Sequence, residues 1–100
     1  MVVVVFRSRI REDADVAAME AGGARMFELA TGMPGFISYK DFAAEDGEYV
    51  SIVEFTDMDT LKAWREHPEH RAMQARARQE FMSEYRIQVC TPARDYRFPA

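Results

Sequence analysis

Residues 64–81 hold the side chains best suited to chemistry in this chain. The only tryptophan, Trp64, and the only two histidines, His67 and His70, lie within seven positions, with Pro68 between the histidines. An unperturbed imidazole titrates at about 6.5, so His70 can act as a base near neutral pH. The same ring can instead simply hydrogen-bond a loop carbonyl, and His67, just before a proline, suits a helix end. The segment is either a base beside a large aromatic surface or a structural helix junction.

A metal site fits this segment poorly. His67 and His70 are three residues apart, but Pro68 breaks the helix that would place both on one face. Cys90 is the single cysteine, which excludes a disulfide within the chain and leaves no CxxC pair of zinc ligands. We expect no metal and no required cofactor here, and haem with His70 as axial ligand remains an alternative.

The composition indicates one soluble domain, residues 1–100. The chain is 48% hydrophobic and 30% charged, as is usual for a globular protein. Its net charge of −4 argues against nucleic acid as the main partner, because a phosphate-binding surface needs an excess of cations. The apolar start, residues 1–6, is too short for a signal peptide or a membrane span. We therefore expect a cytoplasmic protein with no membrane partner.

Hydrophobic periodicity divides the chain into strands and helices. The first strand carries four successive valines and does not alternate with polar residues, so we expect both of its faces to be buried. The predicted strands are 2–10, 36–43, 48–56 and 84–91, with a hairpin at 44–47. The predicted helices are one opened by Glu12, Asp13 and Asp15 and ended at Thr31-Gly32, a short one capped by Asp57 or Asp59, and one from Pro68 to about Met82.

The first predicted helix has an apolar face that includes a glycine. Because Gly23 falls on this face, we expect close packing of the helix on the sheet at that position. The other members of the face are Val16, Met19, Met26, Phe27 and Ala30.

The element order predicts an α+β fold of the ferredoxin-like βαββαβ type, with one four-stranded antiparallel sheet. Right-handed crossovers place the helices on one face of this sheet. The other face stays apolar and uncovered, which a monomer does not tolerate, so we expect a homodimer packed sheet to sheet. The tail still carries Tyr96 and Phe98, so we expect it to pack on something, such as a second chain.

Several segments give the chain a family resemblance. GFISYK at 35–40, SIVEF at 51–55, AWREHPEHRAMQ at 63–74 and YRIQVC at 85–90, in βαββαβ order, resemble the antibiotic biosynthesis monooxygenase (ABM) domain family. The resemblance implies a dimeric α/β barrel built from two ferredoxin-like sheets. Activities in that family include cofactor-independent oxidation of aromatic polyketides or quinols, haem degradation, and isomerisation of a signalling metabolite.

The resemblance also implies roles for individual residues. His70 resembles the family's pocket histidine and Trp64 its pocket tryptophan. The haem-degrading branch uses an asparagine on the first strand, whereas this chain has no asparagine and carries Arg7 near that place. The residues expected to bind the substrate are Trp64, His67, Tyr39, Phe81, Tyr85 and Arg86.

These observations favour a cofactor-independent monooxygenase that acts on a small aromatic molecule, a phenol, a quinol or a polyketide-like compound. An apolar pocket would exclude water, and His70 would accept the phenolic proton. Whether the protein is an enzyme stays open. The alternatives are a non-catalytic dimeric module that binds a small molecule or haem, and a structural dimerisation unit without a ligand.

Overall fold

The chain begins with its central strand. β1 (Val2–Ile10) contains the four valines, whose β-branched side chains suit a pleated backbone. In the computed structural model, which describes residues 1–100, β1 lies between β3 and β4. The remaining elements are α1 (Val16–Thr31), β2 (Phe36–Ala43), β3 (Tyr49–Phe55), α2 (Met58–Arg65), α3 (Pro68–Arg76), the π-helical turn η1 (Ala77–Phe81) and β4 (Met82–Cys90).

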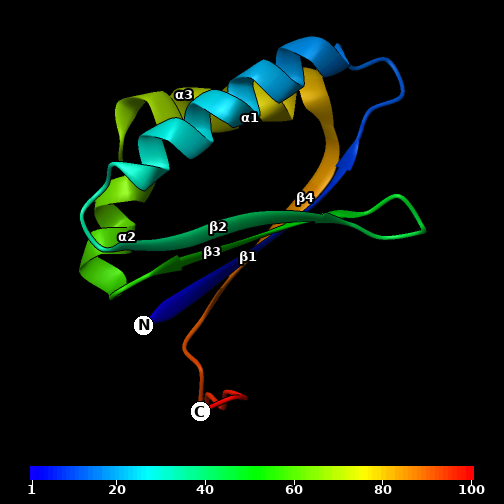
Figure 1. Ribbon diagram of the computed structural model, residues 1–100. Coiled ribbons are helices and arrows are strands. Elements are labelled where there is room, and N and C mark those ends of the chain that lie inside the picture. The colour runs from blue at the N-terminus through cyan, green and yellow to red at the C-terminus, as the bar shows by residue number, and fades with distance from the viewer.

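The four strands form one antiparallel sheet in the order β2-β3-β1-β4. The helices α1 and α3 both lie over one face of this sheet (Figure 1). This arrangement confirms the predicted α+β, ferredoxin-like βαββαβ fold. The register starts at Val2↔Phe55 between β1 and β3 and at Val3↔Cys90 between β1 and β4.

The two faces of the sheet differ in what covers them. Val2 and Phe55 lie opposite each other on the face toward the helices and are 3% and 0% exposed. They belong to a core cluster that also contains Met26, Ala30, Val53, Leu61 and Trp64. Side chains alternate along a strand, so Val3, Val5 and their neighbours point away from the helices. We call this the helix-free face; its apolar residues are Val3, Val5, Phe42, Val50 and Ile52.

The start of α1 is capped by Asp15 alone among the three acids considered for that role. The Asp15 carboxylate accepts a hydrogen bond from the Ala18 N–H at 3.0 Å. Two residues of the predicted apolar face are not buried, because Val16 and Phe27 are 51% and 47% exposed. The buried positions Gly22, Met26 and Ala30 are spaced by four, so one narrow row of the helix meets the rest of the protein.

The expected close contact at a glycine lies one residue earlier than predicted. At Gly22 a Cβ atom would lie 2.5 Å from Cε of Met73 in α3, whereas at Gly23 nothing lies within 4 Å. Gly22 therefore permits the close approach of α1 and α3, and the prediction for Gly23 is wrong.

The break between α2 and α3 lies where the sequence places it. Asp57, rather than Asp59, caps α2 through a capping box with Thr60. The second helix ends at Arg65, and Pro68 is the first residue of α3, where its missing N–H costs nothing.

The end of the last helix differs from the prediction. α3 gives way to the π-helical turn η1, and β4 starts at Met82 rather than at residue 84. Arg11 holds this turn, because its guanidinium donates to the carbonyl oxygens of Arg78 at 2.9 Å and Met82 at 3.3 Å. The sequence pattern shows the helical period. It does not show that Arg11 bonds the backbone carbonyl oxygens at this wider turn.

The C-terminal tail, residues 91–100, has no helix or strand. Tyr96 and Phe98 are 83% and 99% exposed, so nothing within this protomer receives them. Separately, no helix in the structure combines the length and apolar character needed to cross a membrane.

The two adjacent glycines of α1 provide a matched test of helix packing. Gly23→Ala should raise the melting temperature, because alanine favours a helix over glycine by about 1 kcal/mol and nothing obstructs the methyl group. Gly22→Ala should give a lower melting temperature than Gly23→Ala, since Met73 must move away. Thermal unfolding followed by circular dichroism measures both, and equal melting temperatures would contradict the role given to Gly22.

Candidate active site

Trp64 and His70 form a stacked pair where α2 meets α3. Their ring centroids are 4.1 Å apart and the ring planes differ by 10°. Trp64 is 4% exposed and belongs to the core, whereas His70 is only partly buried. The indole therefore gives the imidazole a rigid apolar support while one side of the imidazole remains close to the surface.

One hydrogen bond determines which nitrogen of His70 is free. Nδ1 lies 3.1 Å from the carbonyl oxygen of Trp64. A carbonyl only accepts, so Nδ1 carries the proton and Nε2 of the neutral ring keeps its lone pair. Burial lowers the pKa of His70 below its ordinary 6.5; the bond to Trp64 opposes this shift, and the charge of His67 adds to it. At neutral pH the ring is therefore an uncharged base.

His67 serves the start of α3. It is the N-cap residue, and its Nδ1 accepts a hydrogen bond from the N–H of Glu69 at 3.1 Å. Its ring centroid lies 6.0 Å from that of Trp64, tilted by 50°. His67, Trp64 and His70 are thus brought together, with His67 engaged as a cap.

Two of the expected pocket residues lie elsewhere on the helix side of the sheet. Phe81, at the end of η1, is 2% exposed, with the guanidinium carbon of Arg76 5.0 Å from its ring centroid. Tyr39 on β2 meets Phe27 of α1 edge to face at 5.5 Å. Burial, followed by the charge of Asp41, raises the pKa of Tyr39 above 10.0, so its hydroxyl stays protonated.

The helix side of β4 carries an uncovered apolar row. Tyr85, Ile87 and Val89 are 37%, 42% and 44% exposed, although they point to the same side as the core valines of β1. Tyr85 stacks on Phe6 with centroids 5.5 Å apart, and its hydroxyl accepts a hydrogen bond from Arg78 at 3.0 Å. We use the name β4 row for the three β4 residues Tyr85, Ile87 and Val89 together with Phe6 of the neighbouring strand β1. These side chains leave an exposed apolar surface at the β4 edge of the sheet.

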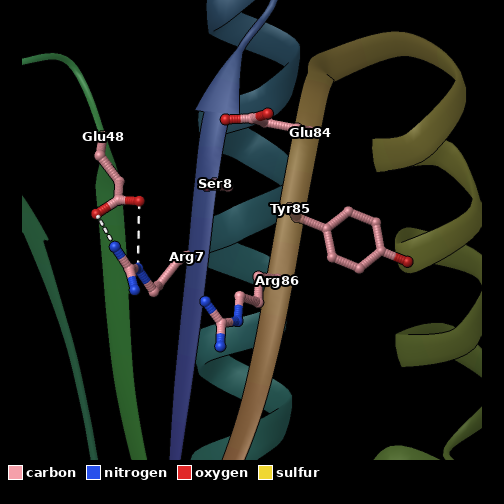
Figure 2. A pocket seen from close by; sticks show the side chains of 6 residues that line it. All are labelled: Arg7, Ser8, Glu48, Glu84, Tyr85 and Arg86. Carbon is pink, nitrogen blue, oxygen red and sulfur yellow. Dashed lines mark hydrogen bonds and ion pairs between the residues drawn. The ribbon is translucent and has the colours of Figure 1, made fainter.

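Arg86 does not join the other candidates. It pairs with Arg7 of β1 and directly follows Tyr85 in β4. Because successive side chains of a strand point to opposite faces, Arg86 points to the helix-free face. Figure 2 shows Arg7, Arg86 and Glu48 in front of the strands with the helices behind them. Within one protomer, strand alternation therefore places Arg86 on the face of the sheet opposite the helices that carry His70.

Arg86 instead lines a polar hollow of about 220 Å³ together with Arg7, Ser8, Glu48, Glu84 and Tyr85. Arg7 donates to Glu48 through Nε at 3.2 Å and Nη2 at 3.1 Å, while the side chain of Arg86 makes no hydrogen bond or ion pair. A second hollow of about 270 Å³, on the same face, is lined by Ser38, Lys40, Phe42, Ile52 and Glu54. Both are smaller than the roughly 300–1,000 Å³ of most ligand pockets. Neither contains His70 or Trp64.

Sequence reasoning missed two residues that the structure brings into contact with Tyr85, namely Phe6 and Arg78. Phe6 ends the run of valines in the first predicted strand, and Arg78 lies within the last predicted helix. Phe6 lies four residues after Val2 in β1, so strand alternation places it on the helix side. The sequence alone could have shown this position. The contact of Arg78 with Tyr85 depends on η1, which the pattern does not show. The structure brings no group of three or more His, Cys, Asp or Glu side chains together as metal ligands.

Comparison with known proteins agrees with this architecture. Rv0793 from Mycobacterium tuberculosis superimposes with a TM-score of 0.82 at 23% identity, covering 94% of this chain and 96% of that one. SnoaB, a cofactor-independent oxygenase from Streptomyces nogalater, superimposes with a TM-score of 0.79 at 21% identity, covering 99% and 97%. At these identities the likeness shows a common fold.

Two sequence comparisons identify the family. The uncharacterized protein YqjZ from Bacillus subtilis (strain 168) is 28% identical over 95 residues, which are 95% of this chain and 82% of that protein. The family model described as antibiotic biosynthesis monooxygenase matches residues 1–76. Since this match spans most of the chain, including the Trp64–His70 pair, the protein belongs to the antibiotic biosynthesis monooxygenase family.

Proposed function

We propose that this protein is a cofactor-independent monooxygenase for a small aromatic phenol or quinol, including polyketide-like compounds. The observation that carries the proposal is the position of His70, a neutral base with a free Nε2 beside a rigid indole. Membership of the ABM family supports it, and so does the shared fold with SnoaB, described as a cofactor-independent oxygenase.

The chemistry needs few protein groups. Nε2 of His70 accepts the proton of the phenolic hydroxyl, which leaves an electron-rich phenolate. The phenolate transfers electrons to O₂, and one oxygen atom bonds to a ring carbon of the same substrate. The ring C–H and the phenolic C–OH both become C=O, and the second oxygen atom leaves as water with the two hydrogens released, so that a phenol gives a quinone. The substrate supplies all four electrons, so the reaction balances without another reductant.

The remaining side chains hold and orient the substrate. The β4 row gives an aromatic ring an apolar surface, and the hydroxyl of Tyr85, already bonded to Arg78, can hydrogen-bond a substrate oxygen. Trp64 and Phe81 are buried, so they shape the site through His70 and η1 rather than by contact with the substrate. Tyr39 contributes from the side of β2 as a neutral hydroxyl.

The working form in this proposal is a homodimer. The helix-free face holds Val3, Val5, Phe42, Val50 and Ile52 with no covering layer in the protomer (Figure 1). Exposing such a continuous apolar surface is unfavourable, and a second copy packed sheet to sheet would remove it from water. The assembly would also enclose the hollow that contains Arg7 and Arg86.

Replacement of His70 by asparagine tests the base. Asparagine can keep an N–H near the carbonyl oxygen of Trp64 but has no basic nitrogen at the place of Nε2. His70→Asn should lower kcat by about 10²–10⁴-fold with little change in melting temperature. Oxygen uptake with a panel of quinols and polyketide-like phenols measures the effect.

The control is Arg71→Ala, an exposed neighbour on the same helix, which should keep full turnover. Unchanged turnover in His70→Asn would refute the role of His70. If no phenol or quinol is oxidised, but haem gives a Soret shift that His70→Ala abolishes, the non-catalytic binding module is the better description.

The lowered pKa of His70 predicts a pH dependence of stability. The unfolded chain takes up the proton near 6.5, whereas the folded chain does so only at lower pH. Between these values the unfolded state binds more protons, so stability falls as the pH is lowered through this window. Between pH 7.5 and pH 5, the melting temperature of the wild type should fall more than that of His70→Asn. These two pH values lie about one unit or more on either side of 6.5. Parallel curves would show that His70 is not buried as described.

Sedimentation velocity at micromolar concentration tests the homodimer. We expect a species of twice the chain mass. Val5→Lys, which places a charge on the helix-free face, should shift the protein toward monomers, because burying an unpaired charge is strongly unfavourable. Ala24→Lys on the exposed side of α1 is the matched control and should remain dimeric. A wild-type mass equal to one chain would contradict the assembly.

A further inference from the structure

The C-terminal tail is the largest feature that the proposed chemistry leaves unexplained. Tyr96 and Phe98, 83% and 99% exposed, are the most exposed of the large hydrophobic side chains in the protein. Residues 91–100 make no hydrogen bond or ion pair with the rest of the chain. Two exposed aromatic rings two positions apart are unfavourable in water, and tyrosine, phenylalanine and arginine are enriched at protein–protein interfaces.

The tail also points toward the place where a second copy would lie. It starts after Cys90, which pairs with Val3, so its origin is at the rim of the helix-free face. From there it runs to the side of the sheet opposite the helices (Figure 1). We propose that the tail of each protomer docks on the second copy of this chain, with Tyr96 and Phe98 as the anchoring side chains. This inference rests on the homodimer proposed above.

The length of the tail is sufficient for this docking. Ten residues in extended conformation span at most about 33 Å. Two sheets packed face to face lie about 10 Å apart. The tail can therefore pass the gap between the sheets and still place six or more residues on the partner. A tail folded back on its own helix-free face would instead occupy the surface that the second sheet needs.

Charge favours the same partner. The tail has two arginines, Arg94 and Arg97, and one acid, Asp95, so it is net positive. The rest of the chain is net negative, although the helix-free face itself carries Arg7, Lys40 and Arg86 beside its acids. On the helix-free face Glu54 bonds only Ser38 and has no cationic partner. The carboxylate of Glu54 and the apolar residues of this face therefore complement a cationic aromatic segment.

Photo-crosslinking from the full-length protein tests where the tail lies. The photoreactive amino acid p-benzoylphenylalanine replaces Phe98, and the dimer is irradiated and run on a denaturing gel. We expect a covalent product of twice the chain mass, formed by crosslinks that mass spectrometry maps to residues 1–90 of the other copy. The same amino acid at Val16, exposed on the helix side, is the matched control and should leave the chains separate. A product of single-chain mass with an internal crosslink would overturn the proposal.

A second variant measures the strength of the contact. In Tyr96→Ala/Phe98→Ala the dimer dissociation constant should rise at least about tenfold, because buried aromatic anchors contribute most at interfaces. Asp95→Ala, in the same segment, should not weaken the dimer. A wild-type dimer whose dissociation constant is unchanged by the double substitution refutes the tail contact alone. A monomeric wild type refutes the homodimer and the tail contact together, while oxygen uptake by that monomer would still support the monooxygenase.

Discussion

The rest of the structure depends on a central strand that is apolar on both sides. β1 pairs with β3 and β4, and alternate residues of its valine run point to opposite faces of the sheet. One set, with Val2 at its start, is covered by α1 and α2 through Met26, Ala30, Leu61 and Trp64. The other set has no cover within the protomer. The same few residues thus fix the core and create the need for a second layer, which the homodimer and the tail would satisfy.

The candidate site is an extension of that core. Trp64 is buried among the residues that hold α2 on the sheet, and its other side supports His70. Because Pro68 ends one helix and begins the next, His70 lies one turn into α3, where its Nδ1 reaches the carbonyl oxygen of Trp64. Packing and chemistry are therefore coupled: the hydrogen bond selects the tautomer, and burial keeps the ring uncharged. A change that loosens α2 would also disturb the base.

The two faces of the sheet carry different side chains. The helix side carries the aromatic and apolar side chains, including Phe6 and Tyr85. The helix-free face carries the arginines Arg7 and Arg86, which are cross-strand neighbours, with only Arg7 paired to an acid. Like charges opposite each other are unfavourable in a sheet, so Arg86 is better accommodated where another carboxylate can approach it. Strand alternation thus separates an apolar, aromatic surface on the helix side from a mixed polar and apolar surface on the helix-free face.

The sequence by itself determined the element order, the ferredoxin-like topology, the hairpin at Asp46-Gly47 and the helix break at Pro68. These features follow from local rules, namely β-branched runs, turn residues and the missing N–H of proline, that neighbours in the chain enforce directly. The cluster of Trp64 with two histidines was also visible in the sequence.

Only the tertiary structure decided which helical positions meet other elements. It placed the close contact at Gly22 rather than Gly23 and left Val16 and Phe27 exposed, because α1 turns the row Gly22, Met26 and Ala30 toward the rest of the protein. It placed Arg86 on the opposite face from His70, since one residue of register inverts every side chain of a strand. The protonation of His70 likewise depends on a carbonyl six residues away, which no local pattern specifies.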